Sequence, residues 1–495
     1  MKRRLSAIAV LLGLLLALPS ASGDAYVTVL HFNDYHGYLQ ARRYGQENFA
    51  VMSRISTAIQ EVRDWNDAHD ASTFVFVAGD ILQGTPLSTV YKGEPDVLAL
   101  NLMDLDAMCV GNHEFDFGFD NFQKLHALAR FPILAANIYV KETSEHLTTP
   151  FVSLTLADGT KGAAFGLTTP DTAVQTSPKN VEQLYFTDAI EEAQKLVPEL
   201  LKEAQFIVAV THLGHDEDLE LAAAVPEIDL IVGGHSHTAV ETPVQVGKTL
   251  VVQTGGYGQT LGQVDMLVSE GDVVKYRGFL REVGPAITPD PQVQAIVDKY
   301  ANQLDDRLRE VIAHTTVRLD GEHELSRAQE TNLGNLVTDI IRDYARADVC
   351  LWNAGGIRSS IETGPITFGD ILTVVPFGNI IATKPVSGEQ LRQVLEFNAA
   401  QTRPFGGFLQ VSGLTMEIEG NRLGKVMVGD RPLDPSATYL MATSEFMLAG
   451  GDGYAMLMEG AEPTYLGYSE SAVVLEGLRT MGTVSPKVEG RIVIK

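Results

Sequence analysis

The sequence predicts an α/β fold with two domains, and three observations support this prediction. The chain has 495 residues, more than a single hydrophobic core usually organises. Short apolar runs that read as buried strands are interspersed with stretches of helical spacing, as in sheets covered by helices. Prolines at Pro285, Pro289 and Pro291 then mark a boundary, after which the character of the chain changes.

The composition is that of a globular protein, with 45% hydrophobic and 20% charged residues. The net charge of −26 is too negative for a general nucleic-acid binder, so we expect no nucleic-acid partner. An anionic small molecule remains possible as a substrate, provided that local cations attract it against the overall field.

The N-terminus is typical of a secretory signal peptide, which we assign to residues 1–23. A basic start, Met1–Arg4, precedes an apolar segment, Leu5–Leu18, and the small residues Ala21–Gly23. The apolar segment is shorter than the ~20 residues of a membrane-spanning helix, and no second run of that length follows. We therefore expect a periplasmic or secreted protein without a membrane span. Cys109 and Cys350 lie in apolar runs, which favours buried free thiols.

The first predicted domain, residues 24–285, contains five strand-like runs that each end in Asp, Asn or His. The runs are Val27–Phe32, Thr73–Ala78, Ala107–Val110, Phe206–Val210 and Asp229–Val232. The polar residues that follow them are Asp34, His36, Asp80, Asn112, His113, His212, His235 and His237. Helical spacing predicts helices at Phe49–Asp64 and near Asp96–Met103.

A lone histidine in a loop is usually just solvated, but five such strand ends in one domain suggest a common site. Oxygen and imidazole ligands without thiolate suit Zn, Mn, Fe or Co. Apart from His113, these residues are seven candidate ligands, which exceed one tetrahedral site, so the pattern predicts two divalent metal ions with Asp80 as the bridge. Such pairs serve the hydrolysis of phosphate esters. His113 could act as general acid or electrophile, with Asp116 orienting its ring.

After the prolines, the apolar stripe of Gln292–Ile312 predicts a helix that connects the domains, within a linker at residues 286–314. A second α/β domain is expected at residues 315–495. Its Gly-rich turns beside Arg and Asn suit close approach to an anion or another ligand. Phe377 and Phe446, each near glycine, are either stacking platforms or core residues.

The stretches NDYHGYL, GDILQGTPLSTVYKG, VGNHEFDFG, THLGHD and GGHSH resemble the secreted 5′-nucleotidase / UDP-sugar hydrolase family of the metallophosphoesterase superfamily. The resemblance covers nearly the whole chain after residue 23. It implies an N-terminal four-layer metallophosphoesterase β-sandwich flanked by helices, and a smaller C-terminal α/β domain that binds the substrate.

The resemblance also implies roles for individual residues. One metal would be held by Asp34, His36, Asp80 and His237, and the other by Asp80, Asn112, His212 and His235. His113 and Asp116 match the catalytic pair. In the second domain, Phe377 and Phe446 would sandwich the base, Asp452 would hold the ribose hydroxyls, and Arg327, Asn353 and Arg358 would hold the nucleotide.

The expected function is hydrolysis of a nucleoside monophosphate to nucleoside and phosphate, possible also for di- and triphosphates and UDP-sugars. Alternatives with the same fold are a 2′,3′-cyclic nucleotide phosphodiesterase or 3′-nucleotidase and a thiosulfohydrolase. The retained phenylalanines and arginines favour a nucleotide over thiosulfate. A secreted nucleotide-binding protein without catalysis is the alternative from another class, which the intact ligand set disfavours. We expect a monomer or dimer whose domains move about the linker helix.

Overall fold

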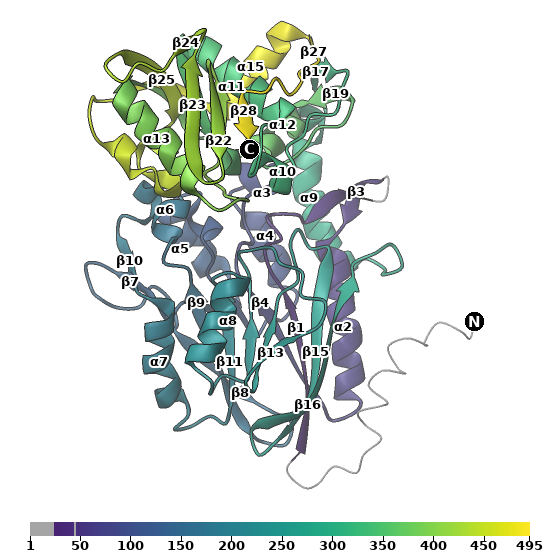
Figure 1. Ribbon diagram of the computed structural model, residues 1–495. Coiled ribbons are helices and arrows are strands. Elements are labelled where there is room, and N and C mark those ends of the chain that lie inside the picture. The colour runs from purple at the N-terminus through teal and green to yellow at the C-terminus, as the bar shows by residue number, and fades with distance from the viewer. Residues whose placement is uncertain (1–23, 44–45) are drawn as a thin grey trace. The chain divides into compact units, whose positions relative to one another are not determined.

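The computed structural model describes residues 24–43 and 46–495, which form two compact units (Figure 1). The first unit comprises most of residues 24–300, and the second comprises residues 301–495 together with 83–90 and 173–181. The predicted signal peptide, residues 1–23, lies outside the described residues. Among the helices that are described, none is long and apolar enough to cross a membrane.

Two six-stranded sheets form the centre of the first unit. The first sheet has the order β16-β15-β1-β4-β5-β6 and the second has the order β13-β14-β12-β11-β9-β8. The strands of the first sheet are β1 (Asp24–Phe32), β4 (Ser72–Val77), β5 (Ala107–Cys109), β6 (Ile133–Leu134), β15 (Thr260–Ser269) and β16 (Asp272–Glu282). Those of the second are β8 (Phe151–Thr155), β9 (Lys161–Thr168), β11 (Phe206–His212), β12 (Leu230–Val232), β13 (Val244–Val246) and β14 (Thr249–Val252).

In each sheet, four neighbouring strands run parallel. They are β1, β4, β5 and β6 in the first sheet, and β9, β11, β12 and β14 in the second. The carboxyl ends of parallel strands lie at one edge of their sheet, where ligands usually bind. The five strand ends predicted to carry ligands are therefore gathered at two such edges, one in each sheet.

Strand β11 shows how the sheets pack. Phe206 and Val208 join a core cluster with residues of the first sheet such as Val29. Ile207 and Ala209 belong to a second cluster, which includes residues of the helices α7 (Ala189–Leu200) and α8 (His215–Ala224). Because successive side chains of a strand point to opposite faces, β11 is buried on both.

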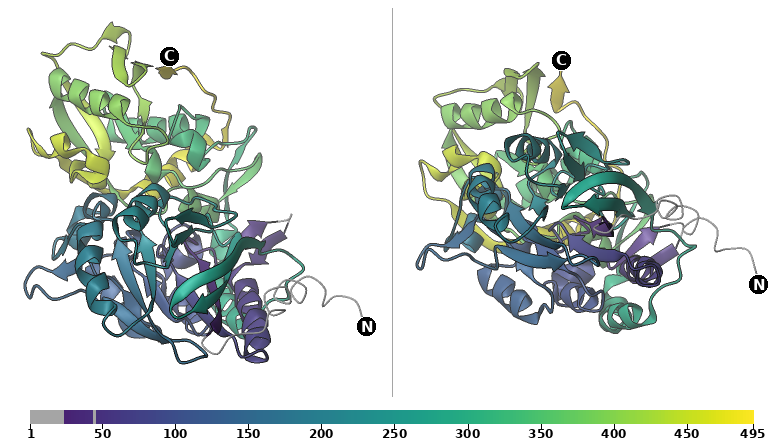
Figure 2. Two further views of the ribbon diagram at one scale, coloured as in Figure 1. Left: turned by 60° about the horizontal axis from the view of Figure 1, so that its bottom comes forward. Right: turned by 90° about the horizontal axis from the view of Figure 1, so that it is seen from below.

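Helices complete the layers on the outside of the two sheets. Figure 1 shows α7 beside the second sheet and α2 (Met52–Asp67) on the opposite side of the unit. Figure 2 shows the same layers from two further directions, with α2 (purple) again outside the strands. The order helix, sheet, sheet, helix confirms the expected four-layer α/β sandwich.

Shorter elements complete the first unit and its connections. They are β2 (Gln40–Arg43), β3 (Gln46–Ala50), α4 (Glu94–Leu100), the 3-10 helix η1 (His113–Phe115), α5 (Phe119–Leu128), β7 (Ile138–Val140) and β10 (Leu184–Phe186). The helices α3 (Pro86–Val90), α6 (Thr172–Gln175) and η2 (Pro178–Val181) lie in the two segments that belong to the second unit, except for Thr172 at the start of α6. Helix α9 (Pro291–Leu308) spans the point where the first unit ends and the second begins.

The second unit has a five-stranded sheet of order β21-β18-β25-β20-β26 and two smaller sheets. Its strands are β17 (Val311–Thr315), β18 (Val349–Asn353), β19 (Gly364–Thr367), β20 (Ile380–Ser387), β21 (Leu409–Ser412), β22 (Leu414–Glu419), β23 (Arg422–Val428), β24 (Arg431–Pro432), β25 (Thr438–Ser444), β26 (Thr464–Ser469), β27 (Thr483–Val484) and β28 (Ile492–Ile494). Its helices are α10 (His323–Ser326), α11 (Asn332–Ala345), η3 (Ala354–Gly356), α12 (Phe368–Val374), α13 (Gly388–Ala400), α14 (Glu445–Leu448), η4 (Gly451–Gly453), η5 (Ala455–Met458) and α15 (Glu470–Met481).

Two predicted helix boundaries are wrong. The helix expected at Gln292–Ile312 ends at Leu308, and its last apolar residues belong to β17, which pairs with β19. The helix expected from Phe49 begins at Met52, and Phe49 is a strand residue of β3. In both cases apolar residues of an adjoining strand fit the helical spacing, which alone cannot separate the two structures.

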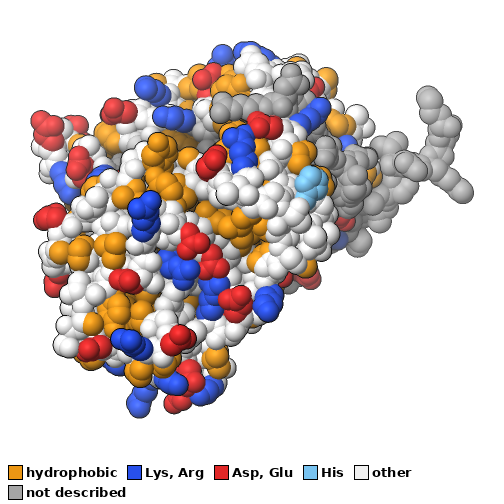
Figure 3. Space-filling view, turned by 90° about the horizontal axis from the view of Figure 1, so that it is seen from above, with side chains coloured by type: hydrophobic (Ala, Val, Ile, Leu, Met, Phe, Trp, Pro, Cys, Tyr) orange, Lys and Arg blue, Asp and Glu red, His pale blue; other side chains and the backbone are white. Residues whose placement is uncertain are grey.

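Both cysteines are buried and free, as the sequence predicts. On the face drawn in Figure 3, acidic and basic side chains are interspersed with apolar ones. That face therefore does not present the continuous basic surface on which nucleic-acid binding usually depends.

Phe206 provides a test of the core between the two sheets, because its side chain is fully buried. We expect Phe206→Ala to lower the free energy of unfolding of the first unit by ~3–5 kcal/mol. The matched control is Phe151→Ala on β8, whose side chain is 38% exposed and should change the stability by less than about 1 kcal/mol. Denaturant unfolding followed by circular dichroism measures both. Equal losses in the two variants would contradict this packing.

Candidate metal centre and active site

The loops after β1 and β4 run side by side. The backbone N–H of Asp34 donates to the carbonyl of Gly79 at 3.1 Å, and that of His36 donates to the carbonyl of Asp80 at 3.1 Å. These bonds continue the pairing of the two parallel strands beyond their ends. The side chains of Asp34, His36 and Asp80 are thereby held in one buried region.

Two hydrogen bonds join the second sheet to these loops. Nδ1 of His212, at the end of β11, donates to the carbonyl of Ala78 at 2.8 Å. The backbone N–H of His235 donates to Oδ2 of Asp34 at 2.9 Å. Gly234 permits this approach, because a Cβ there would lie 2.2 Å from the carbonyl oxygen of Ala78.

All seven predicted metal ligands come together around these loops. His237 Nε2 lies 3.3 Å from Asp34 Oδ1 and 3.0 Å from His36 Nε2. His212 Nε2 lies 3.1 Å from Asp80 Oδ2 and 3.3 Å from Asn112 Oδ1. The potential ligand groups are Asp34, His36 and His237 on one side and Asp80, His212 and His235 on the other. Asp80 Oδ2 also lies 4.0 Å from His36 Nε2, so Asp80 adjoins both groups.

The tautomers of two histidines suit metal binding. A carbonyl oxygen only accepts hydrogen bonds, so Nδ1 of His212 carries its proton toward Ala78, and Nδ1 of His36 carries its proton toward Leu82 at 3.2 Å. A cation bound there would take the place of any proton on Nε2, which would then offer its lone pair to the cluster. Histidine ligands of metals are usually fixed by a bond of this kind from the second ring nitrogen.

The charges in the cluster also favour a cation. Burial alone would raise the pKa of Asp80, but His212, His113 and His36 outweigh it and hold that pKa well below its usual value. Burial lowers the pKa of His212, and Asp80 overcomes this and raises it to about 10. Asp34 Oδ1 is buried and has no hydrogen-bond partner among the described residues. The donor set thus fits two divalent cations of the type that imidazole and carboxylate bind.

Five of the predicted ligand residues adopt a left-handed backbone conformation, with positive φ angles. The values are 48° for Asp34, 50° for His36, 52° for Asp80, 76° for His235 and 54° for His237. Such angles are uncommon outside glycine and cost of order 1–3 kcal/mol each. The surrounding hydrogen bonds maintain this strain, which is frequent where a backbone is shaped for a ligand.

His113 and Asp116 form the predicted pair. His113 Nδ1 lies 2.5 Å from Asp116 Oδ2, and its Nε2 lies 3.9 Å from Asp80 Oδ2. Asp116 therefore holds the proton on Nδ1 and directs Nε2 toward the cluster. His36, Asp80 and His113 are also close enough to be counted as a potential ligand group, so ligation and catalysis must be separated by experiment.

Glu114 is a buried residue that the sequence did not single out. Its carboxylate accepts the backbone N–H groups of Asp80 at 2.9 Å, Ile81 at 2.9 Å and Gly111 at 2.6 Å. It therefore fixes the loop after β4 against the loop after β5, and both loops carry ligands. Its three partners are backbone groups, which leave no residue pattern in the sequence.

We expect Glu114→Ala to lower the affinity for the two metals by about 10- to 100-fold, the usual effect of removing a group that orients metal ligands. The variant leaves three N–H groups of the ligand loops without their acceptor. Titration of metal-free protein with Zn²⁺ or Mn²⁺ measures the affinity. Asp120→Asn, at an exposed position of α5, is the control and should not change it. Unchanged affinity in a folded Glu114→Ala protein would contradict the role assigned to Glu114.

The residues predicted to bind the nucleotide lie in the second unit, where β20 and β25 pair antiparallel with Ile381 opposite Ser444. Phe377 precedes β20 and Phe446 follows β25, so both lie at the same end of the strand pair. Phe446 is 8% exposed, whereas Phe377 is partly exposed and lies 5.8 Å from the guanidinium of Arg358.

The other predicted substrate residues are near neighbours. Asn353 Nδ2 donates to Asp452 Oδ2 at 2.8 Å. A Cβ added to Gly406 would lie 3.9 Å from both Arg327 Nη1 and Asp452 Oδ1. Arg327, Asn353 and Asp452 therefore form one polar group, and Arg358 stands by Phe377.

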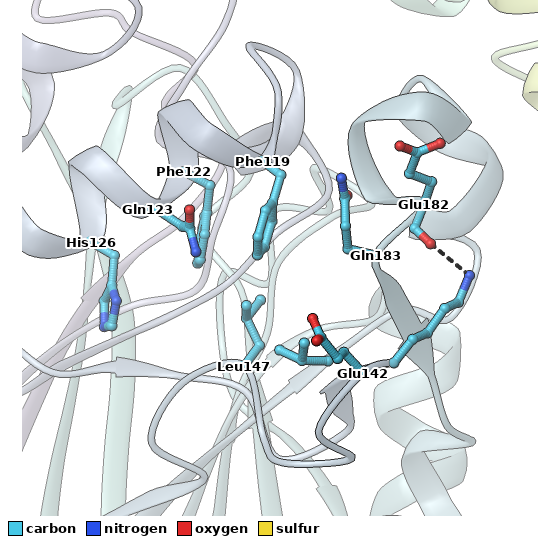
Figure 4. A pocket seen from close by; sticks show the side chains of 10 residues that line it. Phe119, Phe122, Gln123, His126, Glu142, Leu147, Glu182 and Gln183 are labelled. Atoms are coloured by element: carbon cyan, nitrogen blue, oxygen red, sulfur yellow. Dashed lines mark hydrogen bonds between the residues drawn. The ribbon is translucent and has the colours of Figure 1, made fainter.

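Figure 4 shows a separate pocket in the first unit, with a volume of about 430 Å³. The rings of Phe119 and Phe122 from α5 face Leu147 across it, and Glu182 accepts a hydrogen bond from Lys141 through its backbone carbonyl. Its lining residues include none of the predicted ligands or catalytic residues.

Comparison with known proteins gives two family matches along this chain. Residues 27–239 match the calcineurin-like phosphoesterase family, and residues 311–459 match the 5′-nucleotidase C-terminal domain. A solved structure of a 5′-nucleotidase precursor from Thermus thermophilus superimposes with a TM-score of 0.87 at 32% identity, covering 95% of this chain and 99% of that one.

Two curated relatives extend over most of the chain. The 5′-nucleotidase of Vibrio parahaemolyticus is 32% identical over 92% of this chain and 89% of its own length. The trifunctional nucleotide phosphoesterase protein YfkN of Bacillus subtilis is 35% identical over 96% of this chain, which spans only 35% of that longer protein. The chain belongs to the 5′-nucleotidase family, in which a calcineurin-like phosphoesterase domain is joined to a 5′-nucleotidase C-terminal domain.

Proposed function

We propose that this protein hydrolyses phosphate esters of nucleotides, with nucleoside 5′-monophosphates as the primary substrates. The observation that carries the proposal is the largely buried cluster of Asp34, His36, Asp80, His212, His235 and His237, with Asn112 beside His212. Asp80 belongs to two of the residue groups that could hold a metal ion. Family membership supports the same reaction. A protein that only bound nucleotides would not require a cluster of this kind.

In the reaction, water attacks phosphorus, the bond from phosphorus to the ester oxygen breaks, and that oxygen leaves as the nucleoside alcohol. Two divalent ions held by the cluster supply Lewis-acid stabilisation of the phosphoryl oxygens and activation of water. Asp80 would be a ligand of both ions. Asp34, His36 and His237 would complete one site, and Asn112, His212 and His235 would complete the other.

His113 would protonate the departing oxygen or stabilise the charge that develops on the phosphoryl group. Its short contact with Asp116 supports this role, because a carboxylate on Nδ1 fixes the tautomer and leaves Nε2 to act as the donor.

The second unit would select the nucleoside. Phe377 and Phe446 would stack on the base, Asp452 would bind the ribose hydroxyls, and Arg327, Asn353 and Arg358 would hold the rest of the nucleotide. The common strand end of the two phenylalanines and the hydrogen bond of Asn353 to Asp452 support this assignment.

We also propose that the protein is exported, with residues 1–23 as the signal, and acts in the periplasm or outside the cell. The basic start and short apolar segment of these residues support this.

The direct test is a hydrolysis panel on protein loaded with Zn²⁺, Mn²⁺ or Co²⁺. We expect release of phosphate from AMP, weaker activity on ATP and UDP-glucose, and complete loss with a chelator that is reversed by added metal. The panel includes 2′,3′-cyclic AMP and a thiosulfate-type substrate for the alternative functions. Preference for either of these over AMP, or no turnover with any metal, would contradict the proposal.

His113 and Asp80 give a paired test of the two kinds of role. We expect His113→Ala to retain both metals and to lose about 10²- to 10⁴-fold in kcat, the usual contribution of a positioned acid. Asp80→Ala should lose both metals. Elemental analysis and phosphate release on the same preparations measure these effects. If His113→Ala lost metal together with activity, His113 would be a ligand instead.

A further inference from the structure

Glu470 is a fully buried residue in the second unit. Neither the sequence analysis nor the proposed mechanism gives its carboxyl group a role. It is the first residue of α15, after Ser469, whose side chain accepts the N–H of Ala472. A carboxylate at a helix N-terminus is favoured by the helix dipole. Burial nevertheless makes an ionised carboxyl costly unless other groups compensate it.

The groups that surround this carboxyl belong to the loop of Phe377. Asn379 Nδ2 donates to Glu470 Oε2 at 3.4 Å, and the backbone N–H of Glu470 donates to the carbonyl of Asn379 at 2.9 Å. Burial raises the pKa of Glu470 to about 8, and Asn379 with the backbone N–H groups of Phe377, Gly378 and Asn379 opposes that rise. Glu470 thus contacts Asn379 through both its backbone and its side chain, and Asn379 lies two residues after Phe377.

A second carboxylate holds the next residue of the same loop. The N–H of Ile380 donates to Oε1 of Glu445 at 3.2 Å, and Glu445 directly precedes Phe446. The loop of Phe377 is therefore fixed on one side to α15 and on the other to the turn that carries Phe446. Gly378 in this loop has a φ of +69°, a left-handed conformation that glycine adopts without steric strain because it has no side chain.

We propose that Glu470 is a positioning residue, which sets the place of Phe377 relative to Phe446 and thereby determines the affinity for substrates that carry a nucleobase. This inference rests on the proposed function, since it assigns a support to the base-binding pair. A group that only stabilised the fold could be apolar at this buried position. A carboxyl that accepts a hydrogen bond from the side chain of Asn379 instead ties the loop of Phe377 to α15.

The test compares Glu470→Gln with Glu476→Gln, a change at an exposed position of the same helix. Each protein is assayed with AMP and with bis-p-nitrophenyl phosphate, which has no nucleobase. We expect Glu470→Gln to raise KM for AMP by about 10-fold, in line with the cost of misplacing a substrate-positioning group. Its kcat for AMP, its turnover of the aryl diester and all values of Glu476→Gln should remain close to those of the native protein.

A double-mutant cycle shows whether Glu470 acts through Phe377. Phe377→Ala alone should lower kcat/KM for AMP by about 5- to 150-fold, the range expected for the loss of base stacking. If the inference holds, adding Glu470→Gln to Phe377→Ala causes little further loss. Equal losses from Glu470→Gln in both backgrounds, or parallel losses on both substrates, would overturn it.

The thermal midpoint of each variant shows whether it is folded. If Glu470→Gln does not fold, Asn379→Ala replaces it, because this change removes the side-chain donor to Glu470 and leaves the buried carboxyl in place. The same increase in KM for AMP is then expected, and an unchanged KM overturns the inference. A native protein that hydrolyses the aryl diester and not AMP would instead refute the proposed function, and the inference with it.

Discussion

The site of the first unit depends on one buried carboxylate, that of Asp80. Its Oδ2 lies within 4.0 Å of Nε2 atoms from three histidines on three different strand ends, and its Oδ1 accepts the N–H of His113 at 2.9 Å. A charge in such a place is stable only beside positive charge. The arrangement of the neighbouring loops follows from the need to bring cations and polar groups to this point.

The backbone performs much of this arrangement. Glu114 in the first unit holds two loops through main-chain N–H groups, and His212 and His36 are oriented by main-chain carbonyls. In the second unit, Glu470 holds a loop through the side chain and the carbonyl of Asn379. Buried carboxylates used in this way fix the position of a loop more than they add to overall stability. The positions of the predicted metal ligands and of the predicted base-binding phenylalanines therefore depend on residues to which we assign no contact with the substrate.

The sequence was informative where residue type and position carry the chemistry. Apolar runs followed by Asp, Asn or His pointed to side chains that the fold brings into one cluster, because strand ends and polar residues both leave a pattern in the sequence. The pairing of β20 with β25 brings Phe377 and Phe446 to one end of the strand pair. This pairing has no local signal in the sequence and is known only from the strand register of the structure. Glu114 leaves no signal because its partners are backbone groups, and Glu470 leaves none because its partner Asn379 lies 91 positions away in the sequence. Val311 fits the predicted helix because a short apolar strand can match a helical stripe.

Because the predicted ligands come from two sheets, the cluster can form only late in the synthesis and folding of the protein. The ligands span the chain from Asp34 to His237, so a nascent chain shorter than 237 residues cannot contain the complete set. Contacts this distant in sequence form late, after the loops between them have been closed. Metal acquisition is thus tied to the docking of the second sheet on the first, and the bound ions would favour the docked state by mass action. A supply of metal in the compartment where folding ends would therefore stabilise this fold as well as support its chemistry.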